Sequence, residues 1–249
     1  RTRARKATTL RNFYKFLTVQ KRLIDENPLQ ELDSPKIKKT LPKYLTLDES
    51  LALLNAVDGK YKERDYCILT LFLNCGMRLS ELVGINLSDI DSELQSLRVT
   101  GKGSKERIVY LNQACQAALV DYIAKRMGPQ YAKVNDKALF LSRLDQRMSV
   151  KTVQAMVYKY LKLAGLESKH YSVHKLRHTA ATLMYQSGKV DVRVLKDILG
   201  HEQLNTTQIY THVSNRSMEE AMRHNPLSGE SFGGDAADGE ATSTSKETL

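Results

Sequence analysis

The amino-acid sequence predicts a mainly α-helical protein with a small antiparallel β-sheet. Most apolar residues recur at intervals of three and four, the periodicity of helices that bury one face. Residues 97–110 instead alternate apolar and polar side chains on both sides of a glycine-bearing turn, which is typical of a β-hairpin. With 249 residues, 41% of them hydrophobic, the chain is long enough for one sizeable core and a smaller appendage.

The N-terminal stretch predicts an amphipathic helix. Leu10, Phe13, Leu17 and Ile24 recur at roughly helical spacing over residues 7–24, with basic residues between them. Such a helix needs a partner to cover its apolar face. The chain begins at Arg1, within this basic segment, so we expect that further residues precede it in the natural protein.

A basic linker follows this helix. Pro28, Pro35 and Pro42 disfavour regular structure, and we place a domain boundary among them. The lysines of the linker are candidate contacts to a polyanion: Lys36, Lys38, Lys39 and Lys43.

Three helices are expected between the linker and the hairpin. Thr46, with Glu49 three residues later, forms a capping-box pattern that opens the first of them. Gly76 is expected to end the second, and Arg78 lies at the junction with the third. These helices are predicted over residues 47–57, 64–75 and 79–82.

The remainder of the chain predicts a hairpin and more helices. Leu97 and Val99 on one strand, and Ile108 and Tyr110 on the other, flank the turn that holds Lys102 at its tip. Further helices are expected over residues 112–126, 149–164, 172–187, 190–199, 203–211 and 216–222, with a short third strand at 139–141. From residue 229 onward the chain has almost no apolar content, so we expect a disordered tail.

The charge favours a nucleic-acid partner. The formal net charge is +10, and residues 229–249 contain five acids and one lysine, so residues 1–228 carry 37 positive and 23 negative charges, or +14. Such an excess favours a polyanion, because each phosphate that Lys or Arg neutralises releases condensed counterions. A soluble surface that is simply basic is the alternative.

The cysteines and the hydropathy indicate a cytoplasmic protein. Cys67, Cys75 and Cys115 are odd in number and lie in or beside apolar runs, which favours buried thiols over a disulfide framework. The sequence has no apolar run long enough to cross a bilayer and no secretory signal, so we expect no membrane partner.

One predicted helix presents groups suited to a phosphate. Ser172 is a plausible N-cap, and His174 and Arg177 follow on one face with His178 beside them. A guanidinium can grip two non-bridging oxygens while an imidazole donates or accepts a proton. An ordinary solvated helix face is the alternative. His174 and His178 have metal-ligand spacing, but no carboxylate or cysteine joins them, so we predict no metal site.

Five sequence elements have to be considered together. Tyr210 alone would be interpreted as a packing residue. The elements, in order, are Gly76-Met77-Arg78-Leu79-Ser80-Glu81-Leu82, Gly101-Lys102-Gly103, His174-Lys175-Leu176-Arg177-His178, Leu199-Gly200-His201 and Tyr210. In order and spacing they resemble the tyrosine recombinase family of phage integrases, most closely its bacterial Xer subgroup.

The resemblance implies a catalytic domain that breaks and rejoins DNA. It covers residues 44–224 and implies that residues 1–34 are the end of a helical core-binding domain, 35–45 the linker, 46–228 the catalytic domain with its C-terminal helix, and 229–249 the tail. The implied catalytic residues are Arg78, Lys102, His174, Arg177, His201 and Tyr210, with Glu81 in a supporting role. Lys105 and Arg107 lie close to Lys102 in sequence, so the choice of Lys102 rests on the match to Gly-Lys-Gly; we take both as DNA contacts.

The implied reaction needs no cofactor or metal. Tyr210 would attack the scissile phosphorus and form a 3′-phosphotyrosyl bond, which conserves the energy of the phosphodiester for rejoining. The implied partners are double-stranded DNA with a specific recombination site and, through the helix over residues 216–222, other subunits of a homo- or hetero-tetramer. The terminal helix folding back on its own domain is the alternative.

Two other functions remain open at this point. A topoisomerase of type IB shares the chemistry but needs no partner site, and a non-catalytic DNA-binding regulator would use only the basic surface. The target sequence, the partner recombinase, and the choice between chromosome resolution and mobile-element integration or excision do not follow from the sequence.

Overall fold

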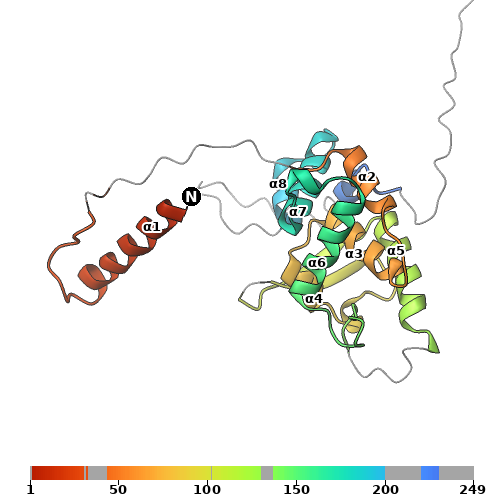
Figure 1. Ribbon diagram of the computed structural model, residues 1–249, viewed down its shortest axis with the longest axis horizontal. Helices are drawn as coiled ribbons and strands as arrows, with labels where there is room; N and C mark the ends of the chain where they lie inside the picture. Colours follow the sequence, from red (N-terminus) through yellow and green to blue (C-terminus); the bar gives the residue numbers. More distant parts are fainter. Residues whose placement is uncertain are drawn as a thin grey trace, which may run out of the picture. The chain divides into compact units, whose positions relative to one another are not determined.

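The computed structural model describes residues 2–30, 32, 44–101, 103–129, 137–199 and 220–229, and Figure 1 shows its ribbon. The chain divides into two compact units, Arg1–Pro42 and Lys43–Leu249. Its α-helices are α1 Thr2–Lys15, α2 Leu47–Asn55, α3 Lys62–Cys75, α4 Leu79–Gly84, α5 Gln113–Arg126, α6 Val150–Leu163, α7 Val173–Gln186 and α8 Val192–Leu199. The described residues also form a π-helical turn, η1 Phe16–Gln20, the 3-10 turns η2 Leu87–Asp89 and η4 Glu167–Lys169, the strands β1 Ser96–Thr100 and β2 Glu106–Tyr110, and a helical turn at 220–223.

The predicted fold class is confirmed, with mostly helices and one small antiparallel sheet. The expected helices up to residue 199 are present, with ends that differ by a few residues, and the predicted segment 203–211 lies outside the described residues. Within the described ranges, no helix combines the length and the apolar character needed to cross a membrane.

The first unit is helical and presents its apolar residues to solvent. The helix expected over residues 7–24 begins earlier, as α1, and continues through η1 to Gln20. Leu10 and Phe13 are 49% and 53% exposed. Leu17 is partly buried and Ile24 lies beyond the end of η1, so the helix carries only part of the predicted apolar face.

The residues predicted to begin and end the first helices of the second unit do so. Thr46 caps α2, because its hydroxyl accepts a hydrogen bond from the Glu49 backbone and the Glu49 carboxylate accepts one from the Thr46 backbone. Gly76 ends α3 in the left-handed conformation, with φ of +58°.

The hairpin pairs β1 with β2 in the predicted antiparallel arrangement. Leu97 lies opposite Val109, and Val99 lies opposite Arg107. Leu97, Val99 and Val109 are buried, so one face of the hairpin packs on the core. Arg107, on β2, points its guanidinium toward α4 and α8.

The prediction of a third strand at residues 139–141 is wrong. The described sheet has two strands, and this segment forms one isolated bridge outside it, between Leu141 and Arg147. The Leu139 backbone donates to the Ile85 carbonyl, and the Phe140 carbonyl accepts from the Met148 backbone. Because loops satisfy its backbone groups, the apolar run is buried without joining the sheet.

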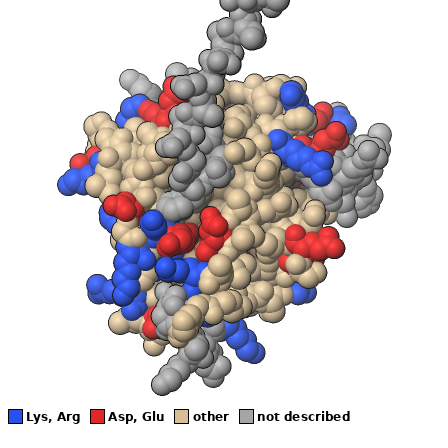
Figure 2. All heavy atoms as spheres, turned by 90° about the vertical axis from the view of Figure 1, so that its right-hand side faces the viewer, with Lys and Arg blue, Asp and Glu red and all other residues tan. Residues whose placement is uncertain are grey.

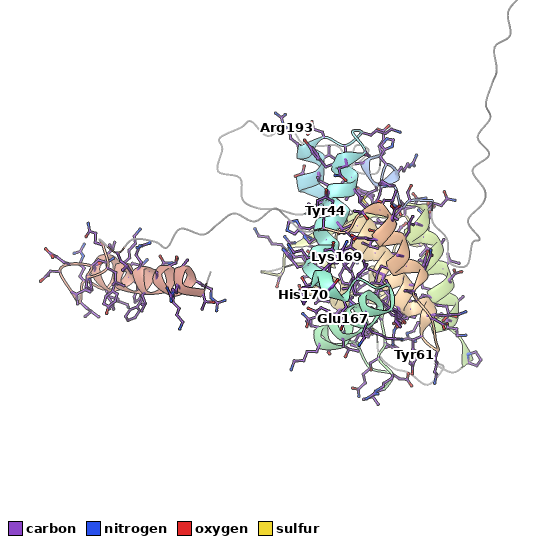
Figure 3. All side chains as sticks on the ribbon, turned by 45° about the horizontal axis from the view of Figure 1, so that its top comes forward. Tyr44, Tyr61, Glu167, Lys169, His170 and Arg193 are labelled. Carbon is purple, nitrogen blue, oxygen red and sulfur yellow. The ribbon has the colours of Figure 1, made fainter. Side chains whose placement is uncertain are left out.

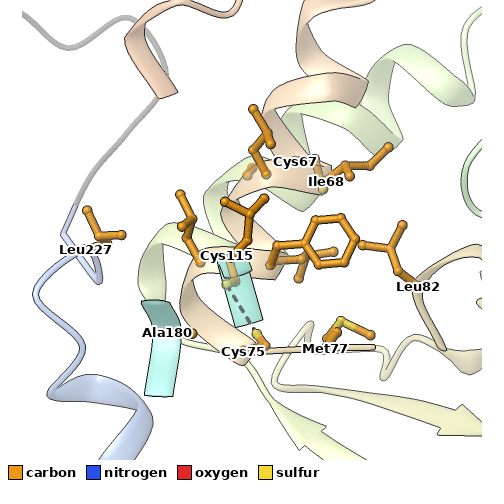
Figure 4. Packing of buried hydrophobic residues seen from close by; sticks show 14 of the residues in the cluster. Cys67, Ile68, Cys75, Met77, Leu82, Cys115, Ala180 and Leu227 are labelled. Carbon is orange, nitrogen blue, oxygen red and sulfur yellow. Dashed lines mark hydrogen bonds between the residues drawn. The ribbon is translucent and has the colours of Figure 1, made fainter. Parts of the chain in front are cut away.

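The core is built around α3. All residues of α3 from Arg64 to Cys75 are buried, and the helix packs against α5 and α7 (Figure 1). Cys67, Cys75 and Cys115 are free, buried thiols, as predicted. Figure 4 shows the Cys75 and Cys115 sulfurs facing each other at 3.6 Å, which is well beyond a covalent S–S bond of about 2.05 Å.

The terminal segment 220–229 packs on its own chain. Ala221 and Met222 are buried in the core, and Asn225 donates from Nδ2 to the carbonyls of Leu73 and Asn74 at 3.1 and 3.3 Å. Of the two arrangements considered for the predicted helix over residues 216–222, the described part therefore shows the one in which it folds back on its own domain.

Candidate active site

A tight turn after α3 positions the first candidate residue, Arg78. A Cβ on Gly76 would lie 2.8 Å from Leu199 Cδ2, so the turn and the end of α8 approach as closely as glycine allows. Arg78 then adopts an extended backbone and serves as the N-cap of α4. Its side chain is 37% exposed, so the guanidinium is reachable from solvent.

Glu81, one turn into α4, is the buried anchor of this region. Its carboxylate accepts from the Arg78 backbone at 2.8 Å, from Arg78 Nη1 at 2.7 Å and from Arg107 Nη2 at 3.0 Å. Burial alone would raise the pKa of Glu81, but the hydrogen bond and charge of Arg107 and the hydrogen bonds of Arg78 outweigh it and hold the pKa below the usual value. Glu81 therefore remains an anion that orients Arg78.

Arg177, on α7, is held between two backbone carbonyls. Nη1 donates to the Gly76 carbonyl at 2.6 Å and Nη2 donates to the Leu199 carbonyl. The residue is only 6% exposed. Burial, followed by the positive charge of Arg78, lowers the pKa of Arg177 to about 10, so it stays protonated at neutral pH. A fixed positive charge thus lies beside the Gly76 turn.

His174 lies at the start of α7 with its side chain exposed. Its ring meets that of His178 edge to face, with centroids 5.0 Å apart. Burial, together with the charge of His174, lowers the pKa of His178. Ser172 is the N-cap residue as predicted, although its side chain makes no capping hydrogen bond.

The hairpin turn lies over this cluster. The Gly101 backbone donates to the Lys105 carbonyl at 2.7 Å, and a Cβ on Gly101 would come within 3.5 Å of Glu81 Oε1. Lys105 is exposed, as a DNA contact requires. Arg107 is in a different setting: its side chain is 17% exposed and is bonded to Glu81 and to the Ile198 carbonyl.

The structure thus brings Arg78, Glu81, Arg107 and Arg177 together and places His174 on the same helix as Arg177. The other predicted site residues lie outside the described part of the chain: Lys36, Lys38, Lys39, Lys43, Lys102, His201 and Tyr210. Among the residues that the structure does describe, no group of three or more His, Cys, Asp or Glu side chains is arranged to hold a metal ion.

The bridging role of Arg107 and the use of the α8 carbonyls were missed by the sequence analysis. Ile198 and Leu199 contribute backbone oxygens, which every residue has, so the residue types give no sign of this role. Arg107 and Lys105 are two positions apart, and a strand places the side chains of such a pair on the same face. The sequence pattern therefore could not tell which of the two contacts DNA.

Figure 2 shows one face of the molecule, on which acidic and basic side chains are interspersed among uncharged ones. Glu167, Lys169 and His170 lie together in the turn between α6 and α7 (Figure 3). A pocket of about 430 Å³ that includes Tyr61 opens at the N-terminal end of α3, at the opposite end of that helix from Arg78.

Residues 43–217 match the model of the phage integrase family. The chain belongs to the phage integrase family. The match includes Arg78, Arg177 and the hairpin between them, and it extends over Lys102, His201 and Tyr210 in the sequence.

Proteins of this family that are similar in sequence include a tyrosine recombinase. The chain is 56% identical over 228 residues to tyrosine recombinase XerC of Caldanaerobacter subterraneus subsp. tengcongensis. The alignment covers 92% of this chain and 64% of that relative, so the chain spans less than two thirds of the relative's length.

Solved structures of the family share the fold. The XerA recombinase is 30% identical, with a TM-score of 0.59, and the match covers 85% of this chain and 80% of XerA. The site-specific recombinase XerH, bound to its difH substrate before cleavage, is 27% identical with a TM-score of 0.59; 83% of this chain and 60% of XerH are covered.

Proposed function

We propose that this phage integrase family member is a site-specific DNA recombinase that cuts and rejoins DNA through a 3′-phosphotyrosyl bond at Tyr210. The observation that carries the proposal is the fixed pair of positive charges, Arg177 clamped between two carbonyls and Arg78 held by Glu81. Its similarity to XerC, XerA and XerH supports the same reaction class.

The two arginines stabilise the transition state in this proposal. Attack on the phosphodiester places an extra negative charge on the non-bridging oxygens of a pentacoordinate phosphorus. Glu81 holds Arg78 and two backbone carbonyls hold Arg177, so in this proposal the two charges need little reorganisation when the negative charge develops. His201, in the segment after α8, would donate a further hydrogen bond to a non-bridging oxygen.

Proton transfer is assigned to the remaining groups. His174 accepts the phenolic proton as the Tyr210 oxygen bonds to phosphorus, since a free tyrosine has a pKa near 10. Lys102 donates a proton to the 5′ oxygen as its bond to phosphorus breaks. A 5′ hydroxyl of another strand then reverses these steps, so strand exchange needs no cofactor and no metal.

The proposed partner is double-stranded DNA with a specific recombination site, bound by Lys105 and the linker lysines. The site-specific recombinase XerH has been solved bound to its difH substrate, which supports this choice of partner. We propose a tetramer on two duplexes as the working assembly. Contact through the C-terminal helix would require residues 220–229 to leave their place against Leu73 and Asn74.

The biological role that we propose is Xer-like resolution of DNA, with integration or excision of a mobile element as the second candidate. The similarity to XerC and XerH favours the first. Three buried free thiols fit a reducing compartment, so we place the protein in the cytoplasm.

The test is capture of the covalent intermediate. The protein is incubated in EDTA with a pool of nicked duplexes whose sequence around the nick is randomised, and SDS-resistant protein–DNA adducts are isolated and sequenced. Wild type is expected to yield an enriched sequence, and Tyr210→Phe is expected to yield no adduct. Tyr185→Phe is the matched control, because Tyr185 is 56% exposed on α7 and is expected to leave the adduct unchanged.

Two outcomes distinguish the alternatives. An adduct without sequence enrichment, with rapid relaxation of supercoiled plasmid, would favour a type IB topoisomerase. A chain that binds DNA but forms no adduct with any duplex of the pool would favour a regulator.

A further inference from the structure

Arg107 occupies a position that a DNA contact would not require. It lies on β2, and its guanidinium donates from Nη2 to Glu81 Oε2 at 3.0 Å and from Nη1 to the Ile198 carbonyl at 2.7 Å. Nε lies 3.5 Å from Glu81 Oε1. One planar group thus connects the hairpin to two other elements, α4 and α8.

On the α4 side, the connection reaches Arg78 through a single carboxylate. The Glu81 side chain is fully buried, and its oxygens receive Arg78 as well as Arg107. A buried carboxylate needs charge compensation, because the attraction of its partners must offset the loss of hydration. Removing Arg107 would leave Glu81 bound by Arg78 alone, and would change both the position and the effective charge of Arg78.

On the α8 side, the connection reaches the segment that leads to His201. The last carbonyls of a helix have no partner within the helix and carry partial negative charge. Arg107 caps the Ile198 carbonyl and Arg177 caps the Leu199 carbonyl. Two arginines from different elements therefore fix the point at which the chain leaves α8, two residues before His201 in the sequence.

We propose that Arg107 is a positioning residue for the recombination reaction, which holds Arg78 through Glu81 and the chain leading to His201 through the Ile198 carbonyl. The proposal rests on the proposed function. It replaces the expectation that Arg107 contacts DNA.

The bonding of Arg107 argues against a phosphate contact. Its donors are engaged by Glu81 and Ile198, its charge is opposed by a buried carboxylate, and 17% of its side chain is exposed. The guanidinium has N–H groups beyond these bonds, but a phosphate would have to compete with the Glu81 carboxylate for its charge at a largely buried side chain. Arg98, on the neighbouring strand, makes only a 3.8 Å ion pair with Asp89 and is 53% exposed, so it is a matched control on the same hairpin.

The experiment compares Arg107→Gln with Arg98→Gln in two assays on the duplex captured by wild type. The first measures the dissociation constant over a range of salt, and the second measures the rate of adduct formation at saturating protein. For Arg107→Gln we expect the rate to fall about 100-fold, as misplacement of about 1 Å can cause, with the dissociation constant changed less than threefold. Arg98→Gln is expected to keep the wild-type rate.

A direct phosphate contact predicts a different pattern. The salt slope of Arg107→Gln would then become shallower by about 0.9 and binding would weaken, because one phosphate contact is lost. That result, or an adduct rate equal to wild type, overturns the proposal. Absence of adduct with wild type would instead contradict the proposed function, so the two failures are distinguishable.

The bridge itself is tested by a double-mutant cycle with Glu81→Gln. If Arg107 acts through Glu81, the double variant should form the adduct only slightly more slowly than the slower single variant. If instead the rate losses of the two single variants multiply in the double variant, the two residues act independently and the bridge is contradicted. Should Arg107→Gln fail to fold, Arg107→Lys decides. Lysine keeps the charge but cannot fork between Glu81 and Ile198, so a rate at least tenfold below wild type supports the proposal and an unchanged rate contradicts it.

Discussion

Arg177 is held on both sides by backbone carbonyls, an arrangement that suits a planar fork rather than a point charge. We therefore expect Arg177→Lys to slow adduct formation by about 10²- to 10³-fold, the loss typical of one fixed transition-state donor. DNA affinity should change little. The matched control is Arg193→Lys, an exposed position on α8 (Figure 3). Equal rates for the two variants would show that the clamp has no role in the reaction.

Glu81 makes a pH prediction with a definite sign. The pKa of Glu81 is lower in the folded protein than in the unfolded chain, so its contribution to stability is present above the unfolded pKa of about 4.3 and is lost as pH falls through the folded pKa. Glu81→Gln lacks this contribution. We expect the variant to be less stable than wild type by about 3 kcal/mol at pH 7, and the difference to shrink under acid.

The measurement is chemical denaturation of both proteins between neutral pH and pH 3. Two profiles that remain parallel down to pH 3 would show that Glu81 is not held as an anion by Arg78 and Arg107.

The sequence predicts residues whose partners are near in the chain. Arg78 and Glu81 are three positions apart, and their bond follows from helix geometry once α4 is placed. The bond of Arg107 to Ile198 spans 91 positions, and it depends on how the hairpin packs against α8. No local pattern encodes that distance, so this part of the site could be found only in the structure.

The Gly76 turn makes a prediction about how α3 and α8 fit together. Gly76→Ala would combine a left-handed backbone with a Cβ 2.8 Å from Leu199 Cδ2, whereas Gly188→Ala has a similar φ, +70°, and nothing within 4 Å. A left-handed alanine costs about 1–2 kcal/mol at either site. We expect Gly76→Ala to lose more unfolding free energy than Gly188→Ala, and to slow adduct formation. Equal losses of unfolding free energy in the two variants would mean that α8 can move away from the added Cβ without a measurable loss of stability.

The terminal segment 220–229 makes a second prediction at this scale. Asn225 binds the carbonyls of Leu73 and Asn74 and accepts from the Leu227 backbone at 3.0 Å. Asn225→Ala leaves these groups unpaired, so we expect a loss of about 1–3 kcal/mol and faster proteolysis within the segment. Arg223→Ala, at an exposed position, is the control. Unchanged protease sensitivity of Asn225→Ala would show that packing of Met222 and Leu227 suffices.

Helices were predictable because their signals repeat, and the wrong strand shows the limit of that reasoning. The caps at Thr46 and Gly76 act within a few residues and mark the ends of α2 and α3. Leu139–Leu141 is short and wholly apolar, so its periodicity cannot distinguish a strand from a buried loop. Its burial was evident from residue type, whereas its hydrogen-bond partners were set by tertiary contacts with Ile85 and Met148.

At the scale of the whole molecule, the net charge is expected to determine the affinity for DNA, whereas the fold is expected to determine the rate of the proposed reaction. Residues 1–228 carry a net charge of +14, while the arginines nearest the proposed chemistry are tied to Glu81 or to backbone carbonyls. Under the proposed function, the charges that bind DNA and those that act on its phosphate would therefore be largely different residues. Affinity and rate should respond to different mutations, which is the basis of the Arg107 and Arg177 experiments.

DNA binding by the chain of 249 residues should accordingly be weak and steeply dependent on salt. Each phosphate neutralised contributes about 0.9 to the slope of log affinity against log salt, and several contacts are expected from a basic excess of this size. The first unit, Arg1–Pro42, holds the linker lysines Lys36, Lys38 and Lys39, which are proposed to contact phosphates and so add salt-dependent affinity without sequence information. The measurement is fluorescence anisotropy with a non-specific duplex between 50 and 200 mM salt, where we expect a slope steeper than about 4. Nanomolar binding that salt does not weaken would contradict this account, because it would require base contacts or apolar burial rather than counterion release.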